Sequence, residues 1–111
     1  MSTVNEDKIK QSIDFTVSKS GKLDESSLQQ MGARLGWAIS QMMAGAAPAL
    51  SITGTPDQIE ILSRTLGLEK NYVQALVTYG GAHPTSQNHK TLTDNAAKEF
   101  YIKTGVPWPF S

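Results

Sequence analysis

The sequence contains no cysteine and no excess of either charge. Without cysteine, disulfide bonds, thiolate nucleophiles, cysteine-bound zinc and iron–sulfur clusters are excluded. Ten Lys and Arg residues balance ten Asp and Glu residues. Because affinity for phosphates needs a basic face, this balance argues against a nucleic-acid-binding protein. It also leaves little repulsion between copies of the chain, which favours self-association.

Charge is missing altogether from Leu35 to Pro56, a stretch long enough to span a bilayer. Polar residues, glycines and Pro48 interrupt this stretch, whereas a spanning helix is richer in Leu, Ile, Val and Phe. We therefore expect a core helix followed by an uncharged loop or strand. The start of the chain, Met1 to Lys8, is polar and lacks the pattern of a secretory signal. The expected location is the cytoplasm, or the host cytoplasm if a phage encodes the protein.

The clearest predicted element is a helix over about residues 25–45. Asp24 is a suitable N-cap, and Gly45 followed by Pro48 marks the end. Apolar residues recur between them at steps of three and four, which is the pattern of a helix with one buried face. They are Leu28, Met31, Leu35, Ile39, Met42 and Ala46.

Three further helices are predicted. Thr55, Pro56 and Gln58 form a capping box that opens a helix ending at Gly67. The second covers 69–79, and a polar loop over 82–92 separates it from a third helix over 94–104 that Thr93 caps.

The remaining segments complete a fold of one domain, residues 1–111. Residues 4–19 fit a helix by the spacing of Ile9, Ile13 and Val17, but 12–18 also alternate like a strand, as do 49–53. Residues 1–11 are predicted to form a flexible arm, and 105–111 an extended tail. The fold class is mainly α: four to five helices in a compact bundle, with at most a two-stranded sheet.

A row of small residues lies on the helix 25–45. Gly32, Gly36 and Ser40 recur every four residues and therefore share one face. Each glycine costs a helix about 1 kcal/mol relative to alanine, so a compensating close contact is expected. We predict that this row packs against another helix, in the same chain or in a second copy, and it is the candidate self-association surface.

The segment from Ile59 to Thr78 resembles a helix-turn-helix, with Gly67 in the position of the turn glycine. The resemblance covers about 20 residues and implies DNA binding through the helix 69–79. That helix has one Lys, one Glu and no Arg, although Asn71, Gln74 and Thr78 are able to contact base edges. A helical hairpin that serves the core fits the same residues.

The two histidines each stand in an H-x-T triplet, His83-Pro-Thr85 and His89-Lys-Thr91. These triplets resemble the paired motifs of the 2H phosphoesterase family, whose two motifs lie far apart on different strands. Here they are close together in one predicted loop, so the family's two-histidine acid–base chemistry does not carry over. Two histidines without neighbouring carboxylates are also an incomplete metal site, and none is predicted.

The polar loop and the tail are nevertheless the places where we expect ligand or partner contacts, because loops carry binding residues more often than core helices. Aromatic residues are common interface anchors, although a tail that folds back and shields the core is the alternative. The candidate binding residues are His83, Thr85, Asn88, His89, Trp108 and Phe110.

No nucleophile–base set and no paired acidic motif on one helix face is visible, so we expect no enzyme and no cofactor. The leading hypothesis is a small soluble interaction protein that forms homo-oligomers and binds a partner protein or a small ligand. Its size suits the compact regulators and inhibitors that phages and mobile elements encode. The alternative is a helix-turn-helix transcriptional regulator. Nucleic acid and membrane are not the partners we expect.

Overall fold

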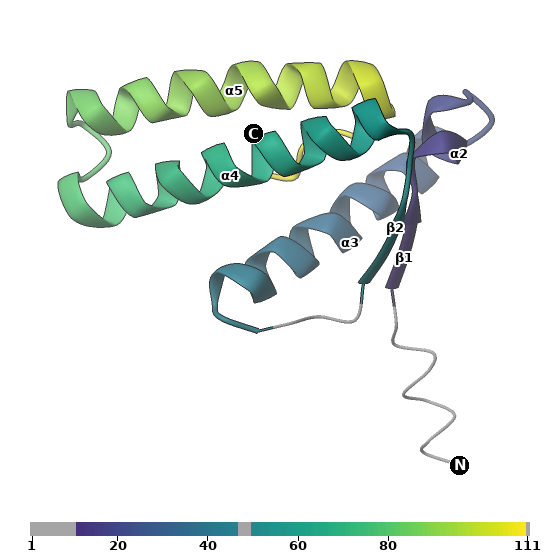
Figure 1. Ribbon diagram of the computed structural model, residues 1–111, viewed down its shortest axis with the longest axis horizontal. Coiled ribbons are helices and arrows are strands. Elements are labelled where there is room, and N and C mark those ends of the chain that lie inside the picture. Colours follow the sequence, from purple (N-terminus) through teal and green to yellow (C-terminus); the bar gives the residue numbers. More distant parts are fainter. Residues whose placement is uncertain (1–10, 47–49, 111) are drawn as a thin grey trace, which may run out of the picture.

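The computed structural model describes residues 11–46 and 50–110 (Figure 1). Strand β1 (Gln11–Asp14) pairs in parallel with strand β2 (Leu50–Thr53), and Ile13 lies opposite Ile52. Parallel strands need a crossover connection, which helices α2 (Phe15–Lys19) and α3 (Glu25–Met43) supply. The predicted minimal sheet is therefore confirmed, and the predicted flexible arm lies almost wholly outside the described residues.

Helices α4 (Pro56–Tyr79) and α5 (Pro84–Thr104) form an antiparallel hairpin that lies across α3 (Figure 1). The mainly α fold class is thus confirmed, with four helices in the described part of the chain. No described helix is both long and apolar enough to cross a membrane.

The segment 12–18, which fitted both a strand and a helix by sequence, is divided between the two, because the chain turns helical at Phe15. The side chain of Asp14 accepts a hydrogen bond from the backbone N–H of Thr16 at 2.9 Å and so caps α2. Ile13 and Phe15 are buried, whereas Val17 is exposed. An N-cap inside an alternating pattern ended the strand earlier than the alternation indicated.

The predicted break at Gly67 is also wrong. Helix α4 continues through this residue, which is exposed and has open space where a Cβ would lie. A glycine lowers helix stability without ending the helix when the flanking turns are packed. Residues 59–78 therefore form one straight run of helix, and the turn of a helix-turn-helix is absent from this segment.

The polar loop predicted over 82–92 is wrong as well, since α5 begins at Pro84. Two of its polar residues, Ser86 and Thr93, face α4. The hydroxyl of Ser86 donates to the carbonyl of Ala75 at 3.1 Å, and that of Thr93 donates to the carbonyl of Leu68 at 3.2 Å. Thr93 is consequently a buried residue within α5 and does not cap it.

The caps that were predicted at the other helix starts are confirmed. Thr55 and Gln58 form the reciprocal capping box of α4, and Asp24 caps α3. The carboxylate of Asp24 accepts a hydrogen bond from the Ser27 backbone N–H at 2.8 Å. That bond holds the pKa of Asp24 below its ordinary value.

Asp24 makes stability depend on pH in acid. A carboxyl whose pKa is lowered by folding stabilises the fold above its unfolded pKa, and this contribution is lost as pH falls through the folded pKa. We expect the free energy of unfolding to fall below about pH 4, and to fall less in Asp24→Asn, which keeps an acceptor that does not titrate. Urea denaturation at about pH 6 and about pH 3 measures the difference. Equal losses in both proteins would contradict this role.

Candidate functional site

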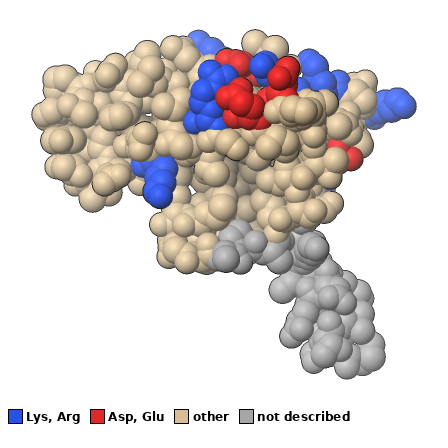
Figure 2. Space-filling model, in the orientation of Figure 1, with Lys and Arg blue, Asp and Glu red and all other residues tan. Residues whose placement is uncertain are grey.

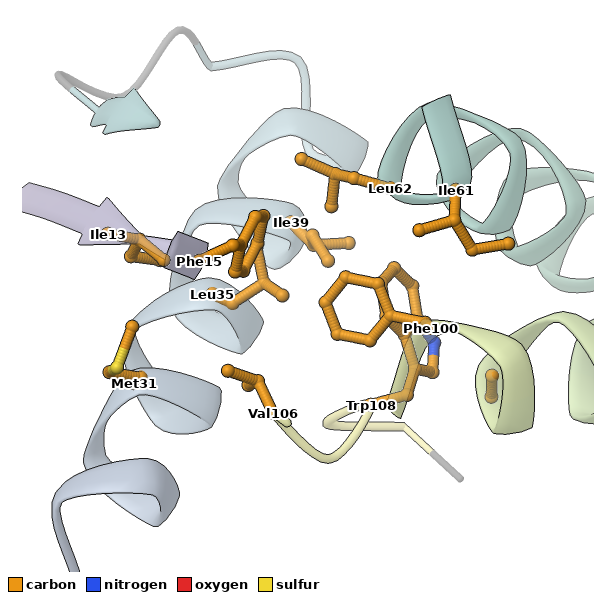
Figure 3. Packing of buried hydrophobic residues seen from close by; sticks show 11 residues of the cluster. Ile13, Phe15, Met31, Leu35, Ile39, Ile61, Leu62, Phe100, Val106 and Trp108 are labelled. Atoms are coloured by element: carbon orange, nitrogen blue, oxygen red, sulfur yellow. The ribbon is translucent and has the colours of Figure 1, made fainter. Parts of the chain in front are cut away.

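The C-terminal tail folds back between α3 and the α4–α5 hairpin. Gly105 takes a left-handed conformation (φ +76°) that ends α5 and reverses the chain. Val106 and Trp108 then enter the core (Figure 3), and Pro107 and Pro109 lie against Gly32 and Gly36 of α3. Of the two readings of the tail, the described residues fit the one in which it shields the core.

Three aromatic rings hold the tail in place (Figure 3). Phe100 of α5 is fully buried and makes edge-to-face contacts with Phe15 at 5.5 Å and with Trp108 at 5.1 Å between ring centroids. Such pairs add to the free energy that burial alone supplies. Trp108 is therefore part of the core, and of the two tail aromatics only Phe110 is exposed.

Trp108 also makes a polar contact inside the molecule. Its indole N–H donates to the carboxylate Oε1 of Glu69 at 2.8 Å. Glu69 lies on α4 and is 5% exposed. The carboxylate takes no second hydrogen bond and joins no ion pair with the described residues. The carboxylate therefore keeps acceptor positions that a ligand in contact with it is able to fill.

A groove of about 1110 Å³ opens beside this pair. We call it the tail groove, because the tail forms one of its walls. The start of α3, the middle of α4 and one side of α5 form the others. Its lining residues are Glu25, Leu28, Gln29, Glu69, Tyr72, Lys90, Thr93, Asp94, Ala97, Lys98, Tyr101, Ile102, Gly105, Pro107, Trp108 and Phe110.

The tail groove is aromatic and carries both charges. Half of the chain's aromatic residues line it, although aromatic residues make up only 7% of the sequence. Lys90 and Asp94, one turn apart on α5, form an ion pair at 2.8 Å. The hydrogen bond to Asp94 raises the pKa of Lys90. An apolar concave surface with a few charged groups is the usual character of a binding site.

The hairpin carries a second group of charged side chains, which lies outside the tail groove. Arg64 of α4 contacts Glu60 at 3.4 Å and Glu99 at 2.8 Å, and Lys103 contacts Glu99 at 3.3 Å. Loss of hydration raises the pKa of Glu99, but hydrogen bonds from Arg64 and Lys103 outweigh it and lower the pKa overall. Figure 2 shows side chains of both signs gathered over these helices. This mixed cluster is not the basic face that nucleic-acid binding needs.

The row of small residues on α3 packs against the tail and not against a helix. A Cβ on Gly32 would lie 3.3 Å from the carbonyl oxygen of Pro107, and one on Gly36 would lie 2.9 Å from the Cβ of Pro109. Ser40 is exposed. The close contact expected at the two glycines thus comes from the chain's own tail, and self-association through this face stays a prediction.

The candidate residues of the predicted loop lie on the first turns of α5. His83 caps the helix, because its Nδ1 accepts from the Thr85 backbone N–H at 3.1 Å, and its ring stacks on Tyr79. Asn88 is exposed. His89 is partly buried, and within the described residues its buried Nδ1 has no hydrogen-bond partner. None of these four residues lines the tail groove, whereas Trp108 and Phe110 do.

The two histidines do not converge on one point. Both belong to the α5 segment, and six residues of helix turn their side chains about 120° apart. Among the described residues, no group of three or more His, Asp or Glu is placed to hold a metal ion. The arrangement of a 2H phosphoesterase site is therefore not present here.

Glu69 is the residue that the sequence analysis missed, since it was counted only as one charge of the supposed recognition helix. Its position carried a signal. Steps of three and four place it on the same face of α4 as Leu62, Thr65 and Tyr72. A charged residue within such a stripe is buried beside a partner or a ligand.

Comparisons of the chain with protein-family models, with curated proteins and with solved structures gave no match.

Proposed function

We propose that the chain is a binding protein without catalytic activity, which holds a segment of a partner protein or a small ligand in the tail groove. The observation that carries the proposal is the groove itself, a concavity of about 1110 Å³ walled by aromatic side chains and by a buried carboxylate. Its described lining includes no Ser–His pair of the kind that activates a hydroxyl nucleophile. By occupying a segment of its partner, the protein would act as a regulator or an inhibitor.

The test compares two matched surface variants. Tyr101 lines the groove and is 55% exposed, whereas Val77 is 83% exposed on α4 and lies outside the groove. Either side chain can be changed to Asp without unfolding the chain, because substitutions at exposed positions usually alter stability by less than about 0.5 kcal/mol.

We expect a protein or small molecule that copurifies with the parent chain to be lost from Tyr101→Asp and kept by Val77→Asp. Pulldown followed by mass spectrometry of proteins and of small molecules measures this. Capture of the same molecules by all three proteins, or by none, would contradict binding in the tail groove. Light scattering of the same samples reports whether the homo-oligomer predicted from the sequence forms.

A further inference from the structure

Glu69 is the unusual feature of the tail groove. Its carboxylate is held at a fixed place by the Trp108 indole N–H, and its other hydrogen-bonding positions take no partner from the described residues. Ionised carboxylates accept about four hydrogen bonds. The Trp108 indole N–H fills one of these positions, so the others are available to a donor group that enters the groove.

The walls around this carboxylate have the chemistry that attracts organic cations. Tyr72, Trp108 and Phe110 line the groove together with Glu69. The faces of aromatic rings attract ammonium and guanidinium groups, and they also bury the alkyl chain that carries such a group. Lys90 and Asp94, a solvent-exposed pair on α5 that also lines the groove, compensate each other in an ion pair.

We infer that the tail groove takes an alkylammonium or guanidinium group, whose N–H groups bond the carboxylate of Glu69 while its alkyl chain lies on the aromatic walls. The group comes from a Lys or Arg side chain of a partner or from a free amine, since both present the same chemistry. This inference rests on the proposed function, because it names what the same groove binds.

Trp108 fluorescence reports binding at the site directly. The chain has two tryptophans, and Trp37 is 48% exposed, so Trp37→Phe leaves Trp108 as the only one. In this background n-butylamine, agmatine, n-butanol and butyrate are titrated into the millimolar range. We expect saturable changes with the two cations, and at least about tenfold weaker binding of the neutral and anionic analogues.

A second arm identifies the source of the cation. Short glycine peptides with a central Lys, Arg or norleucine are titrated in the same way. Tighter binding of the Lys or Arg peptide than of butylamine assigns the group to a protein partner, and equal or tighter binding of the free amine assigns it to a small molecule. Equal binding of the norleucine peptide would overturn the inference.

Two pairs of variants test the role of charge. Glu69→Gln keeps an acceptor for Trp108 and removes the charge, and we expect it to weaken cation binding about tenfold or more. Glu60→Gln is the same change on the same helix outside the groove, and it should leave binding unchanged. Similar losses in both, or none in Glu69→Gln, would overturn the inference.

Lys98→Glu tests the same electrostatic attraction without changing a buried residue, so the inference can still be tested if Glu69→Gln fails to fold. Lys98 is an exposed groove residue, so the variant should fold, and its reversed charge should tighten cation binding about threefold at low salt. Unchanged or weaker binding would count against the inference. If the cations do not bind while Tyr101→Asp still loses its copurifying molecule, the groove binds another chemistry, and only the inference about Glu69 fails.

Discussion

Trp108→Ala is expected to lower the free energy of unfolding by about 3–5 kcal/mol, a large part of the stability of a domain of this size. The indole is 3% exposed and packs against the α4–α5 hairpin, with its ring edge-to-face on Phe100. Its removal leaves a cavity and also leaves Glu69 without its hydrogen bond. In thermal unfolding the melting temperature should fall by about 10–20 °C.

The other tryptophan provides the matched control. Trp37 is 48% exposed on α3, and Trp37→Ala should change the free energy of unfolding by no more than about 0.5 kcal/mol. Trp108→Phe retains a ring but no N–H group, so its loss should lie between the two. Equal melting temperatures for Trp108→Ala and Trp37→Ala would show that the tail does not dock in solution.

Several helix starts and ends were predictable because their chemistry is local. The capping box of Thr55 and Gln58, the N-cap Asp24 and the left-handed Gly105 all act within a few residues of chain. Each satisfies backbone groups that a helix end leaves without partners, whatever the rest of the fold does. The order of residues alone therefore indicates them.

The beginning of α5 was not predictable in this way. Ser86 and Thr93 look like loop residues, but in the fold they are buried and donate hydrogen bonds to carbonyls of α4. A hydrophobic pattern does not register an interface that is made of hydroxyl groups and alanines. At Gly67 the error was the opposite one, because a helix end was predicted where the helix continues. A glycine is tolerated there because the helix faces solvent at this position.

The site depends on contacts that are distant in sequence. Trp108 and Glu69 are 39 residues apart, and nothing in the order of residues pairs them. The sequence indicated an aromatic tail and an acidic residue within an apolar stripe, each without the other. Their meeting follows from the reversal of the chain at Gly105, whereas the sequence analysis predicted only a helix over 94–104 followed by an extended tail.

At the two glycines of α3 the expected close contact is present, but it is made by the extended tail and not by the helix that was predicted. Four residues of helix rise about 6 Å, and two residues of extended chain advance about 6–7 Å. Pro107 and Pro109 therefore meet Gly32 and Gly36 in step, and an extended tail fits the row as well as a second helix would. Small residues at this spacing predict a close backbone, but they do not specify its conformation.

Gly36→Leu should consequently lower the free energy of unfolding by about 1–3 kcal/mol, because the new side chain displaces Pro109. Gly67→Leu is the same substitution in a helix where no atom lies within 4 Å of the new Cβ, and it should raise stability by up to about 1 kcal/mol. Both substitutions gain the same helix propensity, so opposite shifts of melting temperature would isolate the contact between Gly36 and the tail. In the Trp37→Phe background, Gly36→Leu should also shift Trp108 fluorescence towards that of a solvated indole. A lower particle mass by light scattering with unchanged Trp108 fluorescence would instead assign Gly36 to an interface between copies of the chain.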